Sequence, residues 1–249
     1  MPRTHSTLPR LFLEQPLGPG GEVTLGREQS NYLGAVLRRA VGDQVIVFNG
    51  HDGAWLARLA TAGKKAVALE LMEQTAPQPP AADLWYGFAP LKSARLDYVV
   101  QKATEMGAGV IQPVITRFTQ VRNLRPEKLR ANAIEAAEQC EVLSVPEIAP
   151  EIPLATLLDG WHEAHRERRL IVADEALPSC SPVETLAGLK GTPVGLLIGP
   201  EGGFSDDERN LLRAATFVVP VSLGPRILRA DTAAVAALAV IQATIGDWR

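Results

Sequence analysis

Residues 199–203 read Gly-Pro-Glu-Gly-Gly and stand where a buried strand and a helix would meet. The apolar run from Val194 to Ile198 predicts the strand, and the glycines and proline after it end the strand sharply. Ser205, with Glu208 three residues later, predicts a capping box at the start of a helix. In α/β proteins, ligands bind beyond the carboxyl ends of strands, near loop amides and helix N-termini. We therefore expect this loop to form one wall of a binding site.

A second glycine- and proline-containing loop, residues 224–229, follows a strand expected at 217–223 and precedes the last expected helix. Two such loops side by side would enclose a flat small molecule with backbone groups, although plain strand-to-helix turns remain the alternative. The chain contains neither G-x-x-x-x-G-K-[ST] nor G-x-G-x-x-G after a strand, which disfavours P-loop and Rossmann sites. It also lacks the G-x-S-x-G elbow, which disfavours a serine hydrolase.

The composition is that of an ordinary globular protein, with 249 residues, 46% of them hydrophobic and 21% charged. Two cysteines, Cys140 and Cys180, are too few for a disulfide framework or a metal cluster and favour a reducing, cytoplasmic setting. We interpret the near pair His162 and His165 as solvated surface, and expect no metal. No signal-peptide pattern or membrane-length apolar stretch is present, so no membrane partner is expected.

Basic residues are concentrated in one part of the chain. Residues 85–130 contain eight Lys or Arg against three acids, whereas residues 131–175 contain three Arg against ten acids. This segregation favours a basic surface for a polyanion on an otherwise acidic protein. Helix faces that simply happen to be charged are the alternative.

The pattern of expected elements changes at a linker. Residues 1–73 predict a small β-rich domain whose strands, near 10–13, 22–25, 45–48, 55–60 and 67–72, curl into a barrel. Its one helix is expected at 28–40, with Arg38 and Arg39 in the last turn, where the helix dipole favours cations. Residues 74–83 contain three prolines without periodicity and are the expected linker.

From residue 84 to 249 the expected strands and helices alternate, which predicts a parallel sheet covered on both faces. Helices are expected from Ser93, which would cap the first, to a stop at Gly107, and then at 126–141, 154–165 and 182–189. The last helix, from residue 231 or 232 to 245, has almost no polar side. It should be buried all round, by the core, by a symmetric partner, or by both.

Two C-terminal motifs resemble those of the RsmE family of ribosomal RNA methyltransferases, within the SPOUT superfamily: Leu197-Ile198-Gly199-Pro200-Glu201-Gly202-Gly203-Phe204-Ser205 and Leu223-Gly224-Pro225-Arg226-Ile227-Leu228-Arg229-Ala230-Asp231-Thr232-Ala233. Residues 101–107 are similar to the start of the family's catalytic domain, and residues 36–38 to its N-terminal domain. The resemblance covers the chain from about Arg10 to Trp248. It implies an α/β fold in which a parallel sheet with a C-terminal trefoil knot follows a small PUA-like β-barrel domain.

The resemblance also implies a homodimer, S-adenosylmethionine as methyl donor, and N3 of one uridine in 16S ribosomal RNA as acceptor, in the assembled small ribosomal subunit. By the same resemblance, the two loops hold the donor and the end of a neighbouring strand lines the pocket. The expected donor-binding residues are Asp174, Leu197, Ile198, Gly199, Pro200, Glu201, Gly202, Gly203, Leu223, Gly224, Ile227, Leu228 and Arg229.

N3 of uracil carries a proton and must lose it before it can attack the activated methyl group. Arg229 is the first candidate to stabilise the uracil anion, because a guanidinium can donate to uracil oxygens. An ion pair with Glu201 or Asp231 is the alternative role for Arg229. Glu105, Glu201 and Asp231 are the candidates to accept the proton.

Seven basic residues are candidates for phosphate contacts: Arg10, Arg38, Arg39, Lys92, Lys102, Arg117 and Arg122. Two stretches depart from the family pattern. Residues 117–119 read Arg-Phe-Thr where an acidic or polar residue, arginine and serine are usual. Residues 140–143 read Cys-Glu-Val-Leu where serine, glycine and arginine usually follow Glu-Gln, so a basic residue beside the expected cleft is missing.

Two rival functions remain open at this point. A methyltransferase of the same fold that acts on tRNA or on another ribosomal RNA site would differ only in its acceptor. A non-enzymatic RNA-binding or ribosome-assembly factor would keep the fold as a scaffold, but a scaffold alone has no need for two open loops.

Overall fold

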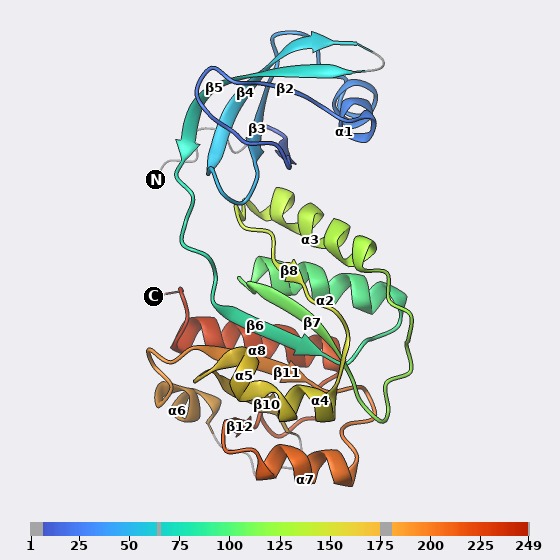
Figure 1. The fold of residues 1–249 in the computed structure, drawn as a ribbon, viewed down its shortest axis with the longest axis vertical. Coiled ribbons are helices and arrows are strands. Elements are labelled where there is room, and N and C mark those ends of the chain that lie inside the picture. The colour runs from blue at the N-terminus through green and yellow to red at the C-terminus, as the bar shows by residue number, and fades with distance from the viewer. Residues whose placement is uncertain (1–6, 64–65, 175–180, 249) are drawn as a thin grey trace. The chain divides into compact units, whose positions relative to one another are not determined.

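The computed structural model describes residues 7–63, 66–174 and 181–248. The chain divides into two compact units, one of Met1–Ala81 with Ala137–Val145 and the other of Ala82–Ala136 with Pro146–Arg249. Each unit has its own β-sheet (Figure 1). The domain boundary at residues 74–83 stays a prediction, although the strand before it is longer than expected and runs to Ala76.

The sheet of the first unit has five strands in the order β1-β3-β4-β5-β2. Its central three strands form the predicted antiparallel meander, whereas β1 pairs parallel with β3. The pairings of the described residues leave β1 and β2 as edges, so backbone hydrogen bonds do not close the predicted barrel there. The strands are β1 (Arg10–Phe12), β2 (Glu22–Thr24), β3 (Gln44–Phe48), β4 (Ala54–Ala62) and β5 (Val67–Ala76).

The helix predicted at 28–40 is shorter than expected. It consists of α1 (Arg27–Asn31) continued by the π-helix η1 (Tyr32–Val36). Arg38 has a φ of 54°, a left-handed conformation that continues no right-handed helix. The prediction that Arg38 and Arg39 occupy the last helical turn is therefore wrong, and the helix dipole does not explain them.

The sheet of the second unit is parallel throughout, as predicted, with the strand order β12-β10-β11-β6-β7-β8 and β9 paired to β7. Its strands are β6 (Leu84–Phe88), β7 (Val110–Ile115), β8 (Glu147–Ile148), β9 (Ile152–Pro153), β10 (Arg169–Ala173), β11 (Val194–Ile198) and β12 (Val218–Val221). Its helices are α2 (Ser93–Glu105), α3 (Pro126–Cys140), α4 (Leu154–Asp159), α5 (Trp161–His165), α6 (Pro182–Ala187), α7 (Asp206–Ala214) and α8 (Ala230–Thr244), and the last residues of α3 belong to the first unit.

Helices cover both faces of this sheet. On one face α8 packs against β11, α2 and α6, and on the other α4 packs against β7, α5 and α7 (Figure 1). The core on the α4 side includes Trp85, Trp161 and Phe217, which are all buried. Because both faces are covered, β11 is buried along its whole length, as its unbroken apolar run predicts.

Several helix ends differ from the sequence predictions. Ser93 is the first helical residue of α2 rather than its cap, because the capping position falls on Lys92 without a side-chain bond. The helix expected at 154–165 is broken at Gly160 into α4 and α5. The predicted stop at Gly107 is confirmed by its φ of 78° and by the bond from the Ala108 amide to the Ala103 carbonyl, 2.9 Å.

The histidine pair does not lie wholly in solvent as predicted. His162 is exposed and meets the ring of Phe217 edge-on, with ring centroids 5.0 Å apart. His165 is half-buried, and its ring lies 4.1 Å from that of Trp161. Burial lowers the pKa of His165, and nearby Arg168 lowers it further. His165 is therefore part of an aromatic cluster.

Helix α8 is only partly buried within the single chain, so the part of the prediction that assigns its remaining burial to a symmetric partner stays a prediction. Leu238 and Ile241 are buried in the unit. Val235, Ala236 and Ala239 are only half-buried, so an apolar side of the helix is incompletely covered.

After β12, at the edge of the sheet, the chain returns through residues 222–229 to α8, which packs against β11. The trefoil knot stays a prediction. Within the described ranges, no helix combines the length and apolar character needed to cross a membrane.

Candidate active site

The loop of residues 199–203 is fixed by close packing and by the helix that follows it. A Cβ atom on Gly199 would lie 2.9 Å from two ring atoms of buried Phe204, so only glycine fits there. The Gly203 amide donates to the Pro200 carbonyl at 2.9 Å and closes a turn, and Gly203 has a φ of 70°.

The predicted capping box at the start of α7 is confirmed. The Ser205 hydroxyl accepts from the Glu208 amide at 3.3 Å, and the Glu208 carboxylate accepts from the Ser205 amide at 2.8 Å. The loop therefore leads into a helix whose N-terminal backbone amides of Ser205 and Glu208 are hydrogen-bonded within the capping box.

The second loop, residues 222–229, connects β12 to α8. Gly224 has a φ of 103°, a conformation that L-residues rarely adopt, and its amide donates to the Ser222 hydroxyl at 3.4 Å. Arg229 is the N-cap residue of α8, and its carbonyl accepts from the Ala233 amide at 2.7 Å. Ile227, between these points, is 86% exposed. An apolar side chain so exposed beside a cavity is available to a bound molecule.

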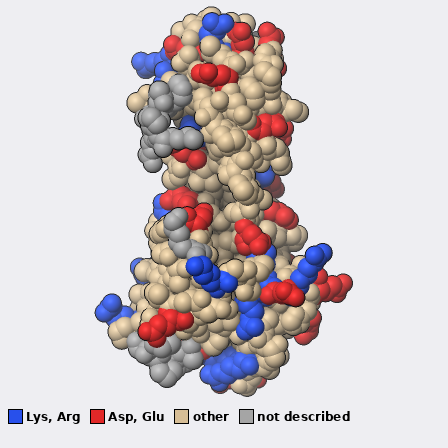
Figure 2. Space-filling view, turned by 90° about the vertical axis from the view of Figure 1, so that its left-hand side faces the viewer, with Lys and Arg blue, Asp and Glu red and all other residues tan. Residues whose placement is uncertain are grey.

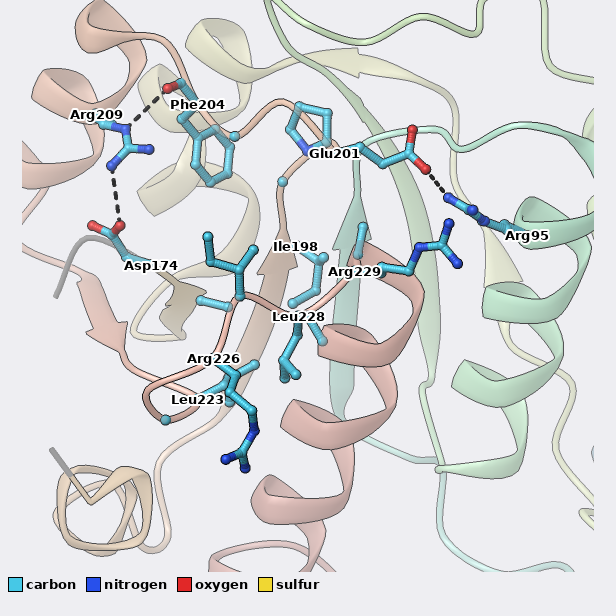
Figure 3. A pocket seen from close by; sticks show the side chains of 18 residues that line it. Arg95, Asp174, Ile198, Glu201, Phe204, Arg209, Leu223, Arg226, Leu228 and Arg229 are labelled. Carbon is cyan, nitrogen blue, oxygen red and sulfur yellow. Dashed lines mark hydrogen bonds and ion pairs between the residues drawn. The ribbon is translucent and has the colours of Figure 1, made fainter. Parts of the chain in front are cut away.

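The two loops enclose a cavity of about 390 Å³ at the carboxyl ends of β10, β11 and β12 (Figure 3). This volume lies within the range typical of small-molecule sites. Its lining comes from both loops, the end of β10, α2, and the first turns of α7 and α8: Arg95, Ala173, Asp174, Ile198, Gly199, Pro200, Glu201, Gly203, Phe204, Arg209, Leu223, Gly224, Arg226, Ile227, Leu228, Arg229, Ala230 and Ala233.

Arg95, in the first turn of α2, holds one end of the cavity together. Its guanidinium forms an ion pair with Glu201 of the first loop, and its Nε lies 3.7 Å from the Asp231 carboxylate at the start of α8. Figure 3 shows the side chains of Arg95 and Glu201 directed toward each other. One cation thus bridges the elements that carry the two loops.

A second ion pair lies on the opposite side of the view in Figure 3. Arg209 of α7 reaches the Asp174 carboxylate, just after β10, at 3.5 Å, and its Nε donates to the Phe204 carbonyl at 3.1 Å. These contacts connect the end of β10 to the loop that follows β11. Between the two ion pairs, Ile198 and Leu228 provide an apolar surface.

Arg229 is exposed and lies at the same end of the cavity as Arg95 (Figure 3). Both acids named as its alternative partners, Glu201 and Asp231, instead face Arg95. Over the residues that the structure describes, no ion pair or hydrogen bond holds the Arg229 side chain. It is therefore available to a second molecule at the rim.

Most of the residues predicted to bind a donor line this one cavity, and two do not. Leu197 is fully buried in the core between the sheet and its helices. Gly202 borders a separate shallow pocket on the outer side of the loop.

Sequence reasoning missed Arg95, Phe204, Arg209 and Arg226 as lining residues. Arg209 had a usable signal, because it follows Ser205 by four residues and so shares a helix face with the capped end. Arg95 had none, because its place depends on β6 lying next to β11 in the sheet.

Glu105 does not line the cavity. Its carboxylate pairs with Lys102 at 2.7 Å, one turn earlier on α2. Ten residues separate Glu105 from Arg95, which at the rise of an α-helix is about 15 Å. Glu105 is therefore placed away from the reacting groups that this site would hold.

The three arginines of the first unit that were predicted to contact phosphates differ in their exposure to solvent. Arg38 is exposed, and Arg39 is half-buried. Arg10 lies over the Phe48 ring at 5.7 Å, and burial lowers its pKa against the opposing influence of Glu141. Arg10 thus has a packing role whether or not it also contacts phosphate.

Among the basic candidates of the second unit, Lys92, Arg117 and Arg122 are exposed, whereas Lys102 is paired with Glu105. On the face drawn in Figure 2, basic and acidic side chains are interspersed and form no continuous basic surface. Within the described part of the chain, no group of three or more His, Cys, Asp or Glu is placed to hold a metal ion. Cys180 lies outside the described residues.

Comparison with known proteins gives the family. The RNA methyltransferase domain family matches residues 77–242, and the RNA methyltransferase PUA domain family matches residues 25–72. The ribosomal RNA small subunit methyltransferase E of Rickettsia conorii is 31% identical over 234 residues, which are 94% of each chain. The chain belongs to this RNA methyltransferase family.

Other family members are similarly related. The ribosomal RNA small subunit methyltransferase E of Synechocystis is 33% identical over 90% of this chain and 73% of its own length. The crystal structure of the Neisseria gonorrhoeae enzyme of the same name, bound to S-adenosyl methionine, matches with 29% identity and a TM-score of 0.84. That match covers 97% of this chain and 100% of the Neisseria chain.

Proposed function

We propose that this protein transfers a methyl group from S-adenosylmethionine to N3 of one uridine in 16S ribosomal RNA. Membership of the RNA methyltransferase family supports the reaction class, and the names of the relatives support small-subunit ribosomal RNA as the substrate. A relative solved with S-adenosyl methionine supports the donor. The observation that carries the proposal is the cavity of about 390 Å³ that both sequence-predicted loops enclose.

The lining of this cavity fits the chemistry of the donor. Ile198 and Leu228 offer apolar surface to a flat base, and the Asp174 and Glu201 carboxylates suit cationic sulfonium and ammonium groups. Arg209 and Arg226 are donors that suit a carboxylate group. When bound there, S-adenosylmethionine supplies a methyl group that is already activated by its positive sulfur.

The protein then contributes mainly by positioning the reactants. Arg95 bridges Glu201 and Asp231, so the two loops are held in one arrangement before a ligand arrives. Phe204 packed on Gly199 keeps the turn of the first loop in place. Such preorganisation lowers the cost of aligning the uracil nitrogen with the methyl group.

Arg229 and Glu201 have the chemistry that the acceptor needs. We assign Arg229 to donate to the uracil oxygens as negative charge develops, because it is exposed at the rim. Among the three carboxylates predicted to accept the N3 proton, Glu201 is the one that lines the cavity, and Arg95 orients it. Glu105, paired with Lys102, has no part in this assignment.

We further propose a homodimer that covers the incompletely buried side of α8, where Val235, Ala236 and Ala239 are half-buried. Its substrate is the assembled small ribosomal subunit in the cytoplasm. The exposed basic residues Lys92, Arg117 and Arg122 would contact phosphates near the site.

The experiment that tests the donor is a calorimetric titration of the purified protein with S-adenosylmethionine. We expect saturable binding at one site per chain. Absence of binding would contradict the proposed enzymatic function and would favour the alternative of a non-enzymatic RNA-binding scaffold. Transfer of labelled methyl groups to tRNA but not to small-subunit RNA would instead favour an enzyme of the same fold with another acceptor.

A further inference from the structure

Phe118 is a large aromatic residue that the fold exposes beside the active site. It lies in the turn that follows β7 and is 47% exposed. Burial of a phenylalanine side chain is favourable, so a phenylalanine exposed in an ordered turn forgoes part of that stabilisation. Single exposed apolar residues are common on protein surfaces, so a role for Phe118 has to be argued from its surroundings.

The turn that presents Phe118 is held by two buried threonines. The Thr116 amide donates to the Thr119 hydroxyl at 2.9 Å, and the two threonine hydroxyls are 2.9 Å apart. The Thr119 amide donates back to the Thr116 carbonyl at 3.2 Å. Thr116 and Thr119 are 4% and 7% exposed, so these bonds are shielded from water. The turn is fixed, and Phe118 is exposed because of it.

The same turn is hydrogen-bonded to the start of α7, which follows the loop of residues 199–203, here called the donor loop. The Arg117 amide donates to the Glu208 carboxylate at 2.7 Å, and the other oxygen of that carboxylate accepts from the Ser205 amide at 2.8 Å. A Cβ atom on Gly202 would lie 3.4 Å from the Cβ of Phe118, so the phenylalanine lies against this loop. Glu208 thus couples the position of Phe118 to the helix that begins after the loop.

Phe118 borders a shallow pocket that shares the donor loop with the main cavity. Pro200 and Glu201 line both, and the remaining lining residues of the outer pocket include Leu91, Lys92 and Val121. This pocket has a volume of only about 10 Å³, so a base would lie over Phe118 at the surface and not inside the pocket, with the loop between it and the cavity.

The charge around Phe118 indicates what kind of molecule binds. Lys92 lines the same pocket as Phe118, and Arg117 and Arg122 are close to Phe118 in the chain. All three are exposed, and in the described ranges their side chains form no ion pair. An aromatic face flanked by cations is the combination that single-stranded nucleic acid uses, with bases stacked and phosphates neutralised. Such a surface suits a polyanion with flat bases.

We propose that Phe118 is a stacking platform for an unpaired base of the RNA substrate that neighbours the methylated uridine. This inference rests on the proposed function. The target uridine must be unpaired or flipped out for N3 to react, which leaves its neighbours without a stacking partner. Phe118 supplies that partner on the outer side of the loop, while the cavity holds the donor on the inner side.

A fluorescence titration tests stacking without any methyl transfer. In Phe118→Trp, a short unpaired uridine-containing RNA should quench the new indole, and the wild-type chain, with its four tryptophans, gives the baseline. Quenching beyond that baseline supports the proposal. If the RNA binds both proteins and the quenching is equal, the proposal is overturned.

Kinetics with small-subunit RNA provide the second test. Phe118→Ala should raise KM for RNA roughly tenfold or more, because base stacking on an aromatic carries about that factor. Phe118→Trp should restore KM, whereas Phe118→Leu, which keeps an apolar side chain without the ring, should not. Calorimetric affinity for S-adenosylmethionine should stay at the wild-type value in all three variants.

Equal KM values for Phe118→Ala and the wild type would overturn the stacking role, and so would full rescue by Phe118→Leu. A matched loss of donor affinity in Phe118→Ala would show that the residue supports the loop and not the RNA. Quenching of Phe118→Trp by RNA without methylation by the wild-type protein would contradict the proposed function alone.

Discussion

At the scale of single residues, the site depends on which charges are already paired. Arg95 engages Glu201 and Asp231, and Arg209 engages Asp174, so these groups hold the cavity in shape. Arg229 lies at the rim, and no described residue pairs with its side chain. Arg229 is therefore available to the acceptor without breaking an existing ion pair, whereas Glu201, the proposed proton acceptor, is held in place by Arg95.

Arg95→Ala should weaken donor binding, because the two loops lose the cation that they share and Glu201 loses its partner. We expect about a two- to fivefold loss of affinity, the range for a partly exposed ion pair that solvent screens. Calorimetry with S-adenosylmethionine measures it. Arg125→Ala, at an exposed arginine outside the cavity, is the control and should bind the donor normally. Unchanged affinity in Arg95→Ala would contradict the bridging role.

Arg229→Ala should lower kcat about 100-fold or more while donor affinity is largely retained, because loss of one preorganised donor to a developing anion has that size of effect. Single-turnover methylation at saturating RNA and donor gives the rate, and calorimetry gives the affinity. An equal loss of donor affinity would make Arg229 a donor-binding residue.

At the scale of elements, sequence patterns predicted most strands and helices of the second unit but only some of their ends. The capping box at Ser205 and the stop at Gly107 are local signals, and both are confirmed. The break at Gly160 and the left-handed Arg38 were not predicted, because the apolar periodicity continues through both positions. The interpretation of His165 as solvated failed because its neighbour Trp85 comes from a distant strand.

The burial of His165 predicts how stability depends on pH. Its pKa in the folded protein is lowered from 6.5, so below about pH 6.5 the unfolded chain binds a proton that the folded chain does not. The free energy of unfolding should therefore be largest above pH 6.5 and fall as pH drops through that value toward the lowered pKa.

His165→Phe keeps an aromatic ring in the cluster and removes the titrating group. Denaturant unfolding between pH 5 and 8 should show a smaller dependence on pH for this variant than for the wild-type chain. His162→Phe is the matched control, since His162 is exposed. Identical pH dependence of His165→Phe and wild type would contradict a lowered pKa for this group.

At the scale of the whole molecule, the sequence was sufficient to predict the fold class, because the alternation of strands and helices and both loops can be recognised in the linear sequence. It was not sufficient for the strand order, which brings β10, β11 and β12 together and places Arg95 beside Glu201. The Leu197 side chain is buried because its strand is covered on both faces, so the place of this residue in the donor site stays a prediction that rests on its backbone. A sequence motif predicts where a loop stands in the chain. The order of the strands in the sheet determines which side chains from other elements line the cavity next to that loop.

The incompletely covered side of α8 makes a prediction for the assembly. Ala239→Glu introduces a charge among half-buried apolar residues, and burying that charge in a symmetric interface is costly. Light scattering after size-exclusion chromatography should show a dimer for the wild type and a monomer for Ala239→Glu. Ala164→Glu, at an exposed alanine of α5, should remain dimeric. A wild-type monomer would contradict the proposed homodimer.

The most direct test of the central claim is mass-spectrometric mapping of methylated nucleosides in small-subunit ribosomal RNA after incubation with the protein and S-adenosylmethionine. We predict one new N3-methyluridine that depends on the donor and is strongly reduced with Arg229→Ala. Methylation at another base or at a ribose hydroxyl, or no methylation of small ribosomal subunits, would contradict the account.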